Sequence, residues 1–109
     1  MATFFRNEVV KNVGTTPVKV IETNGATLAT VIGLSFTNLT DKFVYVNVEL
    51  QSQDSARGFY LKDSILPSGT SLRAVSTGEK LILATSNAMY VSSTLDDSVD
   101  VIISYVEIT

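Results

Sequence analysis

Short runs in which apolar and polar residues alternate, separated by turn-forming residues, extend along nearly the whole chain. In the run FVYVNVELQ, three valines (Val44, Val46 and Val48) share one side of an extended strand, while Phe43 and Tyr45 share the other. The valine side is predicted to face a hydrophobic core. On the opposite side, Phe43 and Tyr45 either lie under a loop or contact a partner.

Turn-forming residues interrupt these runs at short intervals. The pair Asn24-Gly25 tolerates the positive φ of a two-residue turn, so the flanking segments PVKVIET and ATLATVIGLSF are predicted to form a hairpin. The polar stretch TNLTD is typical of a second hairpin connection. Pro67 and Gly69 suit positions i+1 and i+3 of a type I turn, where two further strands are expected to pair.

The segments between the turns are rich in Val, Ile, Thr, Tyr and Phe, which favour pleated strands, and no window has helical periodicity. The spacing predicts an all-β fold: a single antiparallel β-sandwich domain over residues 1–109, of jelly-roll or immunoglobulin-like type, with eight or nine short strands. Residues 1–16 are predicted to be an N-terminal arm or an edge strand. The expected strands are about 4–12, 17–23, 27–37, 43–51, 57–63, 64–66 with 70–76, 79–84, 88–93 and 99–108.

The last expected strand, VDVIISYVEI, has apolar residues on both of its faces. Ile103 and Tyr105 lie on one face, whereas Ile102 and Val106 lie on the other. Water therefore wets neither face well. The strand is either a central one, partly covered by the N-terminal segment, or part of a subunit contact.

Two aromatic residues, Phe4 and Phe5, stand near the N-terminus, where such side chains are unusual unless they dock onto another surface. This segment either folds back onto its own sheet or reaches a neighbouring chain. The residues predicted as candidates for an interface are Phe4, Phe5, Phe43, Tyr45 and Tyr105.

Composition narrows the classes of function. Charged residues make up only 17% of the chain and the net charge is −3, which disfavours direct binding to nucleic acid. The apolar runs are too short to cross a membrane, and nothing is typical of a secretory signal. The chain has neither Cys nor His, which removes thiolate chemistry and the usual general base. The low charge content reflects either chance variation or a surface partly covered by neighbours.

Acidic residues are the main candidates for site chemistry. Asp96, Asp97 and Asp100 offer oxygen ligands for Ca²⁺, but Asp is also common in turns, and the sequence leaves a bound cation open. No motif selects a catalytic pair among carboxylates such as Glu49 and Asp54. We therefore predict that the chain is not an enzyme, and we assign no catalytic residue, cofactor or metal site.

Five stretches together carry a resemblance to a known class of protein: RNEVVKNVGTTPVKVIET, ATVIGLSFTNLTDKFVYVNVEL, LPSGTSLRAV, EKLILATSNAMYVSS and SVDVIISYVEI. Across nearly the full length, the chain resembles small virion structural proteins of tailed bacteriophages, notably those of cyanobacterial and marine phages. The resembling motifs are strand and turn patterns without an active-site signature. The resemblance implies assembly into a symmetric oligomer, without catalysis.

The chain is accordingly predicted to be a non-enzymatic component of a tailed-phage virion, either a capsid decoration (cement) protein or a neck or tail protein. It would act through protein–protein contacts as a homo-oligomer, a trimer if it decorates a capsid. Other virion proteins would be its partners, with assembly in the host cytoplasm. The alternative is a carbohydrate- or receptor-binding module of a tail fibre or baseplate, in which exposed aromatic residues form the binding platform.

Overall fold

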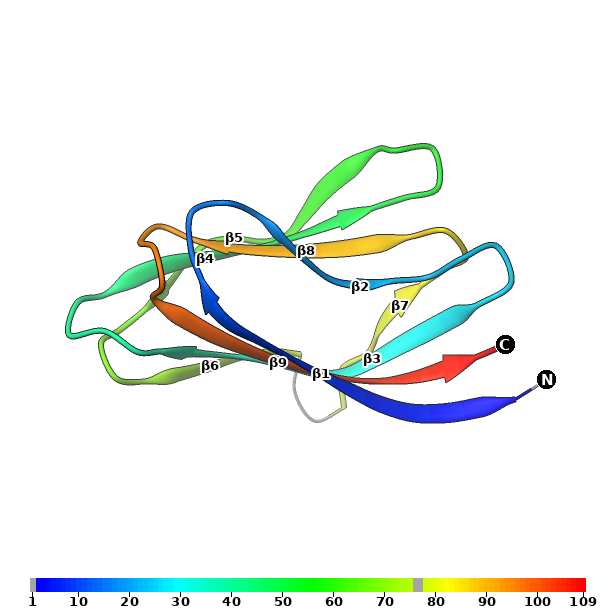
Figure 1. The fold of residues 1–109 in the computed structure, drawn as a ribbon, viewed down its shortest axis with the longest axis horizontal. Helices are drawn as coiled ribbons and strands as arrows, with labels where there is room; N and C mark the ends of the chain where they lie inside the picture. The colour runs from blue at the N-terminus through cyan, green and yellow to red at the C-terminus, as the bar shows by residue number, and fades with distance from the viewer. Residues whose placement is uncertain (1, 76–77) are drawn as a thin grey trace.

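The structure is a computed structural model that describes residues 2–75 and 78–109. Nine strands within these ranges form two antiparallel sheets, which pack face to face as a β-sandwich (Figure 1). The predicted all-β sandwich is therefore confirmed. The described ranges contain no helix, and so none that could span a membrane. The strands are β1 (Thr3–Val13), β2 (Val18–Glu22), β3 (Leu28–Asn38), β4 (Val44–Gln51), β5 (Arg57–Leu66), β6 (Ser71–Val75), β7 (Leu81–Leu83), β8 (Ala88–Ser93) and β9 (Val99–Ile108).

The order of the strands is that of a jelly roll. Sheet A has the order β1-β9-β3-β6, with β7 also paired to β3, and sheet B has the order β2-β8-β4-β5. Most successive strands therefore cross from one sheet to the other, as in the double Greek key that defines this topology. The N-terminal segment is an edge strand of sheet A, and the two termini lie side by side, because the amide of Ala2 donates to the carbonyl of Thr109 at 3.0 Å (Figure 1).

The hairpin predicted at Asn24-Gly25 is wrong. β2 and β3 belong to different sheets, where β2 pairs with β8 and β3 pairs with β9. The turn is stabilised by the side chain of Asn24, whose Oδ1 accepts hydrogen bonds from the amide of Ala26 at 2.8 Å and the hydroxyl of Thr27 at 2.7 Å. Gly25 does not have the positive φ that the predicted turn type requires. A side-chain-capped turn thus directs the chain across the sandwich.

The other two predicted hairpins are also crossovers. TNLTD joins β3 in sheet A to β4 in sheet B, and the segment around Pro67 joins β5 in sheet B to β6 in sheet A. The amide of Thr70 donates to the carbonyl of Pro67 at 3.3 Å, so Pro67 is position i of the turn. Gly69, with φ of 64°, is then at i+2, which is typical of a type II turn.

β4 and β5 form the hairpin that joins two successive strands of sheet B. The break expected between 57–63 and 64–66 is wrong, since β5 is continuous there and the register shifts instead. Asp63 has a φ of 49°, and its amide donates to Oδ1 of Asn47 on β4 at 2.8 Å, which stabilises the irregularity. The expected end of the next strand at 76 and part of the turn before 79 lie outside the described residues.

The core lies between the two sheets and is made mostly of aliphatic side chains. Val44, Val46 and Val48 are buried, as the alternation on that strand predicts. Phe36 on β3 and Ile103 on β9 meet them from sheet A. Because side chains alternate across each strand, the same strands also present a second set of side chains to the outside of the sandwich.

Candidate assembly surfaces

The N-terminal aromatic residues lie on opposite sides of β1. Phe5 is 83% exposed and stands opposite Val106 on β9. Phe4 stands opposite Glu107, and the guanidinium of Arg6 lies 4.8 Å from the centre of its ring. Phe5 therefore projects from the outer side of sheet A, where nothing in the described residues covers it.

Phe5 belongs to a larger apolar surface on the outer side of sheet A. Strand register forms one row from Phe5 through Val106 and Thr30 to Ile82, and a second row pairs Val9 with Ile102. We call this surface the A-sheet face. Its exposed large apolar members are Phe5, Val9, Leu28, Ile32, Ile82 and Ile102. It extends over four strands that are distant in the sequence, so only the tertiary fold assembles it.

Tyr105, predicted as an interface candidate, is a core residue. It is 6% exposed and belongs to the cluster between the sheets. Burial raises the pKa of its hydroxyl, and the nearby carboxylates of Glu8 and Glu107 raise it further. The exposed face of β9 carries Ile102 instead, which the sequence placed on the opposite side of the strand from Tyr105.

A second apolar surface lies on the outer side of sheet B. Phe43 and Tyr45 are both exposed, and their rings pack edge to face with centroids 5.7 Å apart. Tyr45 pairs across the strands with Ile65, which is 55% exposed. We call Phe43, Tyr45 and Ile65 the aromatic cluster. Because Val44 and Val46 hold the inner side of β4, this strand cannot turn the aromatic rings into the core.

Two further exposed aromatic residues, Phe59 and Tyr60, lie on the edge strand β5. Phe59 and Tyr60 occupy successive positions, so they point to opposite sides of sheet B, yet both are exposed. The ammonium of Lys62 lies 4.6 Å from the ring centre of Phe59, whereas the Tyr60 hydroxyl is 3.4 Å from the carbonyl oxygen of Ala74 on β6. They do not form one platform with the aromatic cluster, because Phe59 pairs with Glu49, at the other end of β4.

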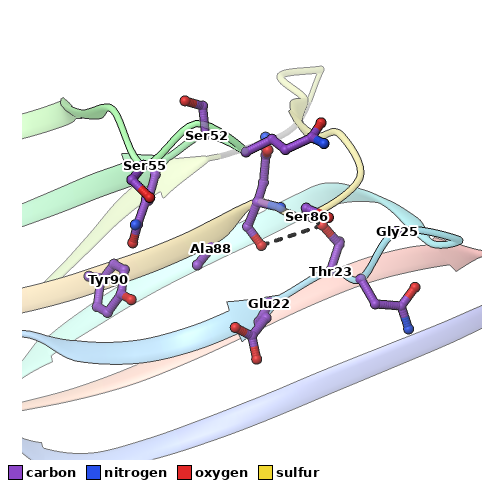
Figure 2. Close-up of a pocket in the computed structure, with 12 residues that line it drawn as sticks. Glu22, Thr23, Gly25, Ser52, Ser55, Ser86, Ala88 and Tyr90 are labelled. Carbon is purple, nitrogen blue, oxygen red and sulfur yellow. Dashed lines mark hydrogen bonds between the residues drawn. The ribbon is translucent and has the colours of Figure 1, made fainter.

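A polar hollow of about 660 Å³ opens between the turns at one end of the sandwich (Figure 2). Thr23, Ser52, Ser55 and Ser86 face it together with the ring of Tyr90. Much of this polarity serves the turns. The amide of Thr23 donates to the carbonyl of Asn87 at 2.8 Å, and its hydroxyl accepts from the amide of Asn87 at 2.9 Å.

The acidic cluster near the C-terminus stabilises the fold. Oδ1 of Asp96 accepts hydrogen bonds from the amide and the hydroxyl of Thr15, at 3.1 and 2.9 Å, and these bonds lower the pKa of the Asp96 carboxyl. Oδ1 of Asp100 accepts from the amide of Asn12 at 3.1 Å. These two carboxylates therefore join the β8–β9 connection and β9 to the end of β1. Within residues 2–75 and 78–109, no group of three or more His, Cys, Asp and Glu is arranged to hold a metal ion.

The two carboxylates considered for catalysis, Glu49 and Asp54, do not form a pair; each contacts a different residue of the β4–β5 hairpin. Glu49 forms an ion pair with Arg57 at 2.7 Å, and that guanidinium lies 4.0 Å from the ring centre of Tyr90. Asp54 accepts a hydrogen bond from the Ser52 hydroxyl, which lowers the pKa of Asp54. These contacts bind the β4–β5 hairpin to β8 and hold its turn.

Comparison with known proteins identifies similar folds. No protein-family model matches the chain, and no curated protein matches it. A subunit of the Bacillus endospore appendages, described as a family of disulfide-linked pili, is similar with a TM-score of 0.59 and 9% identity, over 98% of this chain and 88% of that one. The infectious bursal disease virus VP2 subviral particle is similar with a TM-score of 0.50 and 7% identity, over 96% of this chain and 37% of that one. At these identities, the likeness concerns the fold alone.

Proposed function

We propose that this chain is a non-enzymatic structural subunit that acts through protein–protein contacts as a homo-oligomer. The observation that carries the proposal is the presence of an exposed apolar surface on each outer side of the sandwich: the A-sheet face and the aromatic cluster. A jelly roll needs only its inner faces to form a core, so apolar residues gathered on both outer faces serve contacts with other molecules.

The more specific proposal is that of a tailed-phage virion component, placed in the capsid decoration, the neck or the tail and assembled in the host cytoplasm. Its support is the resemblance of strands and turns to such proteins over nearly the full length, together with the use of jelly rolls in viral capsids. The similar folds come from proteins described as a pilus and a subviral particle, which are repeating assemblies. Other virion proteins are the proposed partners, and a trimer is proposed for decoration of a capsid.

Assembly of this chain would differ from that of the pili in its chemistry. Those appendages are described as disulfide-linked, whereas this chain has no cysteine. Its contacts are therefore noncovalent and depend on buried apolar area. Association is expected to weaken on cooling and in urea, because both reduce the hydrophobic contribution.

The test uses the double variant Phe43→Asp with Tyr45→Ser. Both side chains are exposed, so the variant is expected to fold, while a charge at the centre of the aromatic cluster blocks its burial against a partner. Sedimentation velocity should show a smaller species than for the wild type. Gln53→Asp is the control, since it adds the same charge at the turn of the β4–β5 hairpin. Unchanged association of the double variant would exclude the aromatic cluster from the interface.

A carbohydrate- or receptor-binding role is the second candidate, and the polar hollow beside Tyr90 is the observation that favours it. Hydroxyl and amide groups next to an aromatic ring suit a neutral sugar. A glycan array probed with the purified chain separates the two candidates. The structural role predicts no bound glycan, whereas a hit that is lost in Tyr90→Ala would favour the sugar-binding role.

A further inference from the structure

We propose that the A-sheet face binds the same face of a second copy of this chain about a two-fold axis. The inference rests on the proposed function, since it names the partner and the surface for one of the contacts of a self-assembling subunit. Four observations carry it: the chemistry of the face, its area, its shape and the position of Arg73.

The A-sheet face lacks charge over most of its extent. Between the chain termini and the Val9–Ile102 pair, the outward side chains of β1, β9, β3 and β7 that register brings together are Thr3, Phe5, Asn7, Val9, Leu28, Thr30, Ile32, Ser35, Ile82, Ile102, Ser104, Val106 and Ile108. None of them is charged, in a chain with eight basic and eleven acidic residues. The charged residues on this side of β1 and β9, Lys11 and Asp100, lie beyond that pair. Two copies, each with a net charge of −3, repel one another least where such neutral faces meet.

The area of the face suits a dimer of modest affinity. Strands about 4.8 Å apart that rise about 3.3 Å per residue give the uncharged region about 500 Å² in projection, and its projecting side chains raise the accessible area further. Two such faces approach the roughly 1,200 Å² at which specific protein interfaces begin. A second copy thus supplies an area near the lower limit of specific interfaces, as expected for a dimer of modest affinity.

The shape of the face is self-complementary. Phe5 projects from one side of it, and a hollow of about 270 Å³ lies on the same face beside Gly33, at the register shift of β3. Ile102 and Ser104 line this hollow. In a two-fold pair, a knob and a hole on one surface make two equivalent contacts, since Phe5 of each copy enters the hollow of the other.

Arg73 fits this arrangement. It lines the hollow from β6, opposite Ser35, at the edge of the uncharged region. A phenyl ring that enters the hollow would meet this guanidinium, and a cation beside an aromatic face is favourable when water is excluded. With Phe5 on β1 and the hollow centred on β3, the two-fold axis passes close to Ser104 on β9 between them.

The first test exploits the lack of native cysteine. Sheets that stack face to face lie about 10 Å apart, too far for a direct disulfide, so Ser104→Cys is treated with a short bis-maleimide crosslinker. Gln53→Cys, which is exposed at the turn of the β4–β5 hairpin and outside both apolar surfaces, is the control. The expected result is a crosslinked dimer for Ser104→Cys and monomer for Gln53→Cys. Equal crosslinking of the two, or none with Ser104→Cys, would overturn the inference.

The second test compares Phe5→Ala with Phe59→Ala by sedimentation equilibrium. Both residues are exposed on edge strands, one in each sheet, so the same change is made on opposite faces. Phe5→Ala is expected to weaken the dimer by at least about 30-fold, and Phe59→Ala by less than about threefold. If the Phe5→Ala variant associates as strongly as the wild type, this interface is refuted but the proposed function is left intact. A wild type that stays monomeric at every concentration refutes both.

Discussion

The side-chain amide of Asn38 donates a hydrogen bond to the carbonyl oxygen of Leu66, 3.0 Å away. The same amide nitrogen donates to the carbonyl of Lys42 at 2.8 Å, while Oδ1 accepts from the amide of Thr40 at 2.9 Å. Asn38 is only 2% exposed. One buried amide therefore joins the crossover from β3 to β4 with the crossover from β5 to β6, and so holds the two sheets together at this end of the sandwich.

We expect Asn38→Asp to destabilise the fold strongly. A carboxylate has no hydrogen to donate, so the change turns two buried contacts with carbonyl oxygens into repulsive ones. The free energy of unfolding should fall by at least about 2 kcal/mol. Urea denaturation followed by circular dichroism at pH 7 measures this, with Asn7→Asp on the exposed strand β1 as the control. A loss no greater than that of the control would contradict the assigned role.

Strands were predictable from the sequence because their determinants are local. The alternation around Val46 gives both the strand and its buried side, and the structure agrees. Pairing was not predictable, because the same turn chemistry serves a hairpin within one sheet and a crossover between sheets. At Asn24 the side chain caps the turn, and the destination of β3 is decided by its long contact with β9. That contact joins residues far apart in sequence and leaves no local signal.

The candidate surfaces were predictable only in part. The aromatic residues of the aromatic cluster follow from alternation, since Val44 and Val46 claim the inner side of the strand. The last strand has apolar residues on both sides, so its sequence cannot say whether Tyr105 or Ile102 faces outward. Of the A-sheet face, only Phe5 was named as a candidate, because members such as Leu28 and Ile82 become neighbours only through strand register. The sequence signal for this face was the presence, on several strands, of apolar residues at the alternate positions that point away from the core.

Gly14 should resist substitution. A Cβ at Gly14 would lie 2.7 Å from Oδ1 of Asp96 and 3.0 Å from its Cα, which belongs to the backbone. Gly14→Ala must therefore push the β8–β9 connection away and break the bonds to Thr15, at a cost of about 1–3 kcal/mol. Gly25→Ala is the matched control, because its Cβ would meet no atom within 4 Å, and it should be neutral or slightly stabilising. Thermal unfolding of both variants measures the difference, and equal stability would contradict the predicted clash.

Because of the hydrogen bonds between Thr15 and Asp96, the free energy of unfolding is expected to depend on pH in the acidic range. The pKa of the Asp96 carboxyl is lowered in the folded chain by hydrogen bonds from Thr15, so its contribution is present above the unfolded pKa near 4 and is lost as the pH falls through the folded pKa. In the Asp96→Asn variant, the free energy of unfolding should therefore fall less steeply than in the wild type as the pH drops below about 4. Chemical denaturation between pH 2 and about 6 measures this slope. Asp97→Asn, which removes the same charge from the same turn, is the control, and an identical slope in both variants would contradict the prediction.

Alanine substitutions at two neighbouring residues of β9, Ile102 and Ile103, should affect stability and association differently. Ile103 is fully buried between the sheets, whereas Ile102 is 48% exposed on the A-sheet face. Ile103→Ala removes packed core atoms and should lower the free energy of unfolding by about 2–5 kcal/mol. Ile102→Ala should change it by less than about 0.5 kcal/mol when unfolding is measured at protein concentrations low enough to dissociate the proposed dimer.

For association, the larger effect is expected from Ile102→Ala rather than from Ile103→Ala. Ile102 lines the hollow that receives Phe5 of the second copy, so Ile102→Ala should weaken the dimer while leaving the fold intact. Urea denaturation at low protein concentration and sedimentation equilibrium at high concentration measure the two quantities on the same samples. If Ile102→Ala destabilised the monomer as much as Ile103→Ala, the outer side of sheet A would contribute to the fold rather than to a contact. A double change at both positions should show nearly additive losses in unfolding, because the two side chains point to opposite sides of the sheet.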